Sequence, residues 1–157
     1  MRRSRVVRIT PALVLLLLLA ACNDTTLVTV SKALHDYSVA LNGIQNTVIA
    51  ANAQGLMTTE ETAPIVQLLF KLNEAGKRAS ALTRNLSTLP PDKANQLSSI
   101  LNPVLQEVQG ALSSGLFGIK NAQTRDNILG ALTTAQVALS TITSLLPQPA
   151  PAPTGGK

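Results

Sequence analysis

The chain has 157 residues, a formal net charge of +5 and only 2% aromatic residues. Four of its thirteen Lys and Arg residues lie within residues 1–8, so the rest of the chain carries nine basic against eight acidic side chains. That remainder has no basic cluster, and only Tyr37, Phe70 and Phe117 could stack on bases, so the composition argues against nucleic-acid binding.

Residues 1–21 have the pattern of an export signal. The first eight residues contain four arginines and no acid, and from Ile9 to Ala21 the only polar side chain is Thr10. A membrane-spanning helix needs roughly 20 apolar residues, so this run is too short to span a bilayer. We therefore expect residues 1–21 to be a signal peptide that is removed and takes no part in the mature fold.

Cys22 is the only cysteine, so it cannot form a disulfide within the chain. With the three residues before it, it gives the sequence Leu19-Ala20-Ala21-Cys22, which resembles the lipobox of bacterial lipoproteins. The resemblance covers only the first 22 positions. It implies that a diacylglyceryl group joins the Cys22 sulfur, that signal peptidase II cuts between Ala21 and Cys22, and that the new amino group is a further site of acylation.

This lipid would anchor the protein to a membrane without spanning it, because two or three acyl chains hold a protein essentially permanently. In Gram-negative lipoproteins, aspartate directly after the lipidated cysteine resembles an inner-membrane retention signal. Here that position holds Asn23, which favours the outer membrane, with the protein facing the periplasm. We expect residues 22–26 to form a short lipidated linker.

The first predicted helix runs from Leu27 to about Ala53. Seven apolar residues, spaced three and four apart, form one face of this helix: Leu27, Val30, Leu34, Tyr37, Leu41, Ile44 and Val48. Gly55 suits a left-handed cap at its end.

A second helix is predicted after the sequence Thr58-Thr59-Glu60-Glu61, which has the form of a capping box. Pro64 leaves two starts open: the helix begins at the box and kinks, or it begins near Ala63. Its apolar stripe runs from Ile65 to Leu86. On the outer face, Glu74 and Arg78 have the spacing of an i,i+4 ion pair.

The third and fourth helices follow from similar signals. Pro91 and Asp92 suit a helix start, and Pro103 predicts a kink farther along the third helix. The apolar positions of the third helix are Leu97, Ile100, Leu101, Val104, Leu105, Val108, Ala111 and Leu112. The fourth helix should begin between Asn121 and Asp126 and reach Leu146, with an inward face of Ile128, Leu132, Ala135, Leu139, Ile142 and Leu145.

Four amphipathic helices without a strand signal predict an all-α, up-and-down antiparallel four-helix bundle over residues 27–146. A long helical hairpin that oligomerises is the alternative. Residues 147–157 begin with alternating prolines and contain two glycines, so we expect a disordered, extended tail. At about 3.1 Å per residue, this tail would reach roughly 20 to 30 Å.

The sequence offers little chemistry. His35 is the only histidine and is expected on the exposed side of its helix beside Asp36, and no G-x-S-x-G motif accompanies it. No residues have the spacing of a metal site, and no glycine-rich sequence has the form of a phosphate loop. We therefore expect no catalytic residues, no metal and no cofactor, and a protein that is not an enzyme.

The last residue, Lys157, suggests a second attachment. The order of lipid, helices and terminal lysine resembles Braun's lipoprotein, whose terminal lysine is joined to peptidoglycan. The resemblance implies wall attachment through Lys157.

Two functions remain open from the sequence. The first is a non-enzymatic scaffold or binding module, whose partner is an unidentified envelope protein or peptidoglycan. The second is a small carrier of a lipid-like ligand, or an inhibitor of a periplasmic enzyme. Pro64 and Pro103 favour the carrier, because kinked helices could separate and leave an apolar pocket.

Overall fold

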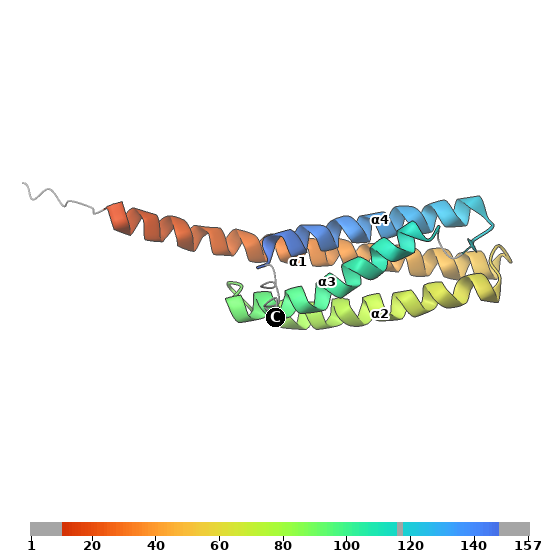
Figure 1. The fold of residues 1–157 in the computed structure, drawn as a ribbon, viewed down its shortest axis with the longest axis horizontal. Coiled ribbons are helices and arrows are strands. Elements are labelled where there is room, and N and C mark those ends of the chain that lie inside the picture. Colours follow the sequence, from red (N-terminus) through yellow and green to blue (C-terminus); the bar gives the residue numbers. More distant parts are fainter. Residues whose placement is uncertain (1–10, 116–117, 148–157) are drawn as a thin grey trace, which may run out of the picture.

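The structure is a computed structural model that describes residues 11–115 and 118–147, with side chains from residue 25 onward. It consists of α1 (Pro11–Ala53), α2 (Thr59–Thr83), α3 (Pro91–Ser113) and α4 (Ala122–Leu145), with no strand in the described ranges (Figure 1). The prediction of an all-α fold with four helices is confirmed. The tail predicted from residue 147 lies outside the described residues, except for Pro147.

Helix α1 is longer than predicted. It runs without a break from Pro11 through residues 22–26, which we expected to form a linker, and projects beyond the other helices (Figure 1). Neither glycine nor proline occurs between Pro11 and Gly43, so nothing in the sequence interrupts the helix there. From Pro11 onward, therefore, the expected signal, the expected linker and the first bundle helix form one continuous helix.

The helix boundaries follow the capping signals. Gly55 has a φ of 66° after α1, and Thr58 forms the predicted capping box, so α2 begins at Thr59 and continues across Pro64. The earlier of the two possible starts is thus the correct one. Asn121 caps α4, since its side chain accepts a hydrogen bond from the N–H of Thr124 at 2.9 Å.

The four predicted apolar stripes form one core. All seven predicted positions of α1 are buried. Partly buried against the core are Leu82 near the end of α2, Leu86 three residues beyond that end, and Ile100, Leu105 and Leu112 on α3. The prediction for Leu145 is wrong: 41% of this residue is exposed, and Leu146 is buried in its place. The helix ends at Leu145, and Leu146 is extended with a ψ of 151°, so helical spacing no longer applies.

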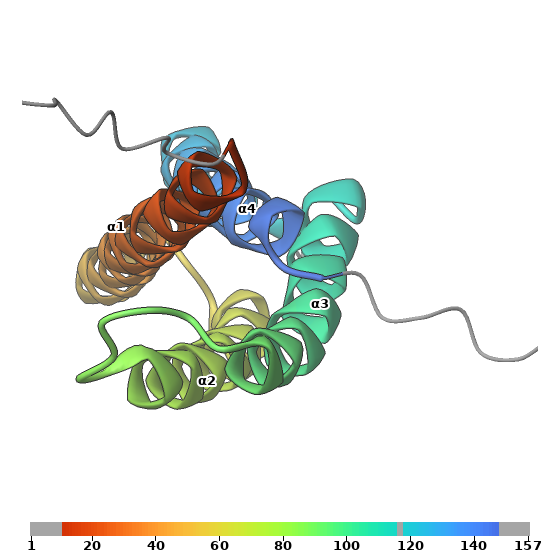
Figure 2. The same cartoon turned by 90° about the vertical axis from the view of Figure 1, so that its left-hand side faces the viewer.

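Each helix packs against two others, in the order α1–α2–α3–α4 and back to α1 (Figure 2). The α1–α4 contact is the most extensive, and small residues allow it: a Cβ added to Gly43 would lie 3.9 Å from the Cβ of Ala131. Among the described helices, α4 is long and apolar enough to cross a membrane. Its buried face within the core accounts for this composition.

Candidate functional site

The predicted lipidation site lies on α1, but its side chain is outside the described ones. The backbone at Ala21 and Cys22 is helical. Lys157, the predicted wall-attachment residue, lies outside the described residues altogether. Lipidation, cleavage and wall attachment therefore remain predictions.

His35 and Asp36 lie where the sequence places them, on the exposed side of α1. No cluster of three metal-ligating side chains occurs among the described residues. The candidate sites considered below are the grooves between the helices.

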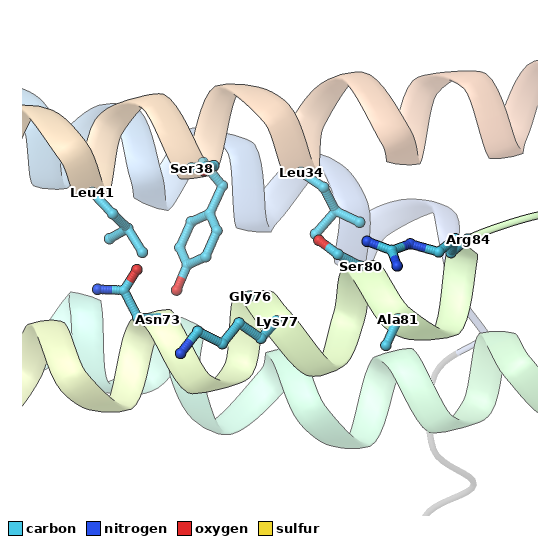
Figure 3. A pocket seen from close by; sticks show the side chains of 10 residues that line it. Leu34, Ser38, Leu41, Asn73, Gly76, Lys77, Ser80, Ala81 and Arg84 are labelled. Carbon is cyan, nitrogen blue, oxygen red and sulfur yellow. The ribbon is translucent and has the colours of Figure 1, made fainter.

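The first groove lies between α1 and α2 and has a volume of about 350 Å³ (Figure 3). Edges of Leu34, Tyr37 and Leu41 form its α1 side, and polar side chains of α2 form the other. The ring of Tyr37 on α1 packs against Gly76 on α2 in this groove. The Tyr37 hydroxyl donates a 2.8 Å hydrogen bond to the carbonyl oxygen of Leu72, and burial raises the pKa of this phenol.

Two basic residues, Lys77 and Arg84, line this groove and no acidic residue does. The Lys77 Nζ lies 3.0 Å from an oxygen of Glu74, so the predicted pair of Glu74 with Arg78 is wrong. The i,i+3 neighbour takes the place of the i,i+4 neighbour, since both spacings lie on one helix face. Arg84 forms none of the ion pairs found among the described residues. No motif or spacing in the sequence marks Arg84 as a groove residue.

The second groove lies between α1 and α4 and is larger, about 420 Å³. It is lined by Val39 on α1 and Val137 on α4, which are 55% and 61% exposed. It also contains one basic and one acidic side chain, Lys32 and Asp36. This groove therefore combines exposed apolar surface with both signs of charge.

The sequence predicted an apolar pocket at Pro64 and Pro103, and the structure differs at the two prolines. Pro64 lines a third groove, of about 320 Å³, between α2 and α3, where Lys71 and Glu107 form a 3.0 Å ion pair. Pro103 is exposed on α3 and lines none of the three grooves described above. The helical backbone continues through both prolines. A groove therefore lies at Pro64 and none of these grooves lies at Pro103.

Glu61 is the buried acid of the described chain, and its role is structural. One carboxylate oxygen accepts a 2.8 Å hydrogen bond from the N–H of Thr58, and the other accepts a 2.9 Å bond from the N–H of Lys120. These two backbone donors hold the pKa of Glu61 below its usual range. The residue thereby joins the start of α2 to the α3–α4 connection.

Comparison with models of protein families, with curated proteins and with solved structures finds no match to this chain.

Proposed function

We propose that this chain is the precursor of a bacterial envelope lipoprotein, anchored through acylated Cys22, whose helical domain is a non-enzymatic scaffold or binding module. The lipobox-like sequence Leu19-Ala20-Ala21-Cys22 after an arginine-rich, apolar start carries the proposal. The bundle begins five residues after Cys22, at Leu27, the first buried residue of the described side chains. The anchor would therefore hold the bundle close to the lipid surface.

The mature domain, in this proposal, is an up-and-down antiparallel bundle. The sequential order of helix contacts and the short connections between the helices support this topology. In such a bundle the end of α4 lies at the same end as the start of the mature chain. Peptidoglycan, joined through Lys157, is a partner in this proposal.

The substitution Cys22→Ser tests the anchor in cells that export the full chain. We expect the variant to lose incorporation of labelled fatty acid and to leave the membrane fraction, while the wild-type protein has a modified Cys22 as its first residue by mass spectrometry. Membrane retention of a fully labelled Cys22→Ser protein would contradict the proposal. A matched control, Ser31→Ala on the exposed side of α1, should remain labelled and anchored.

Placement in the outer membrane follows from Asn23. We expect the wild-type protein in the outer-membrane fraction of a Gram-negative host, and Asn23→Asp to move it toward the inner membrane. If the wild-type protein is found in the inner-membrane fraction, this part of the proposal fails while the anchor stands.

A second candidate function is a carrier for a lipid-like ligand, favoured by the α1–α2 groove. Its volume lies within the usual range of small-molecule pockets, roughly 300 to 1,000 Å³, and its charged side chains are both basic. A fatty acid could place its carboxylate near Arg84. Native mass spectrometry of protein released from membranes tests this. Ligand mass should be lost in Ser80→Trp, which fills this groove, and kept in Thr134→Trp, which alters the other one.

A further inference from the structure

Two exposed valines, Val39 and Val137, line the groove between α1 and α4, and the exposed Val28 lies three turns before Val39 on the same face of α1. This surface, the α1–α4 face, is defined by Val28, Lys32, Asp36, Val39, Val137 and Thr141. Its three valines are 68%, 55% and 61% exposed, and the 420 Å³ groove runs between the helices. The two helices lie side by side over this length (Figures 1 and 2).

The threonines on this surface add to its apolar character. Three threonines line the groove of this face: Thr29, Thr134 and Thr141. Each hydroxyl group donates to the carbonyl four residues earlier in its own helix, at 2.8, 3.0 and 2.9 Å respectively. A threonine bonded in this way has satisfied its donor within its own helix and leaves its methyl group to contact a partner. The groove walls are therefore less polar than their composition indicates.

The charges on this surface complement each other. Lys32 and Asp36 lie one helical turn apart on α1, both are exposed, and neither takes part in the ion pairs found among the described residues. A partner with charge of one sign would be attracted by one of them and repelled by the other. A second copy of the same surface offers both opposite charges, and a two-fold interface that brings Lys32 of each copy near Asp36 of the other forms both pairs at once.

We propose that the α1–α4 face docks a second copy of this chain, in a parallel, two-fold symmetric pair. The parallel direction rests on the proposed lipid anchor, because two chains held at the same end by one membrane have their α1 helices aligned. Lys32 and Asp36 then differ in height by about 6 Å, the rise of four residues. A lysine side chain bridges such an offset, as in the staggered interhelical pairs of coiled coils.

The anchor also explains how a modest surface could suffice. Stable dimers in solution commonly bury more than about 1,200 Å². Confinement to one membrane raises the effective concentration of the chains and restricts their orientation, so a smaller contact can hold them together. Association should therefore be stronger on membranes than for the protein dispersed in detergent.

Cysteine cross-linking tests this arrangement in membranes that contain the full exported chain. Cys22 is the only native cysteine, and the proposed acylation blocks it. Val39→Cys should cross-link to a dimer with a short thiol-specific reagent. The control Phe70→Cys lies on α2, where 68% of Phe70 is exposed, and should cross-link far less. Equal dimer yields, or cross-links of Val39→Cys to a different protein in place of the dimer, would overturn the proposal.

Charge exchange within the Val39→Cys background gives a second test. Lys32→Asp and Asp36→Lys should each reduce the rate of cross-linking by about tenfold, because both symmetric ion pairs become repulsive. The double variant Lys32→Asp/Asp36→Lys should restore the wild-type rate. If single variants have no effect, or the double variant is no better than the singles, the proposed pairing is wrong.

Labelled fatty acid, followed in the same samples, separates this proposal from that of the anchor. A chain that is labelled and membrane-bound but gives equal yields for Val39→Cys and Phe70→Cys contradicts only the dimer. A chain without label contradicts the anchor and the parallel direction derived from it. In that case, preferential cross-linking of Val39→Cys over Phe70→Cys still supports self-association through the α1–α4 face.

Discussion

The ring of Tyr37 on α1 lies directly against the backbone of Gly76 on α2. A Cβ added to Gly76 would be 3.1 Å from Cε1 of the ring, closer than ordinary van der Waals contact. The ring has little freedom to move away, since Tyr37 is 1% exposed and its hydroxyl is bonded to Leu72. The missing side chain at Gly76 therefore sets how closely α1 and α2 approach.

Gly76→Ala should destabilise the protein by about 1 kcal/mol, because overpacking outweighs the gain in helix propensity. The control Gly110→Ala lies in α3, where an added Cβ meets nothing within 4 Å. This control should be stabilised by about 0.5 to 1 kcal/mol. Urea unfolding followed by circular dichroism measures both, and similar gains for the two variants would contradict the close approach.

The phenol of Tyr37 should resist ionisation in the folded protein. Burial raises its pKa, so the folded state disfavours the phenolate, and the stability it contributes is lost as the pH rises above the unfolded value of about 10. Because this is the only tyrosine, phenolate absorbance reports it directly. The absorbance should rise together with loss of helical circular dichroism, whereas in urea it should rise near pH 10. Ionisation near that pH with intact helices would contradict its burial.

Local spacing predicts much of this fold, and contacts between distant segments account for what it misses. The capping box at Thr58 and Glu61 is recognisable from four consecutive residues. The second oxygen of Glu61, however, bonds the N–H of Lys120, 59 residues later. Periodicity assigns both residues to helix starts or connections, but it does not say which connections meet.

The positions of the candidate grooves also depend on contacts between distant segments, which helical periodicity does not predict. Apolar periodicity identifies inward positions of single helices, such as Leu34 on α1 and Leu72 on α2. A groove forms where the exposed sides of two packed helices meet. Val39 on α1 and Val137 on α4 line one such groove. Pockets are expected at Pro64 and Pro103 because a proline that can kink a helix is visible in the sequence, whereas the contact between two helix surfaces is not.

The capping network of Glu61 predicts a dependence of stability on acid. Since the pKa of Glu61 is lowered by folding, its contribution is present above the unfolded pKa of about 4.3 and is lost as the pH falls through the folded value. Glu61→Ala should therefore lower the urea midpoint near neutral pH, and its difference from wild type should shrink below about pH 4. Thr58→Ala, which removes only the side-chain cap, should cost about 1 kcal/mol.

Removal of Glu74, which forms an exposed ion pair with Lys77, is the control for removal of the buried Glu61. It shows how much stability is lost when a glutamate charge is removed from the surface. Glu74→Ala removes the partner of Lys77 at the surface and should change stability by less than about 1 kcal/mol at neutral pH. Urea titrations of Glu61→Ala, Glu74→Ala and wild type at several pH values give the comparison. A Glu61→Ala effect that persists undiminished in acid would show that its carboxylate does not provide the stabilisation.

The end of α4 offers a direct test of where helical periodicity stops. Leu146 leaves the helix in an extended conformation and is 5% exposed, whereas Leu145 is 41% exposed. Leu146→Ala should therefore cost about 2 kcal/mol in the free energy of unfolding, near the lower limit for buried leucines, since the site lies at the end of the core. Leu145→Ala should change it by no more than about 0.5 kcal/mol. If Leu145→Ala proves the costlier substitution, the inward face of α4 continues with helical spacing, and the chain does not turn at Leu146 to close the core.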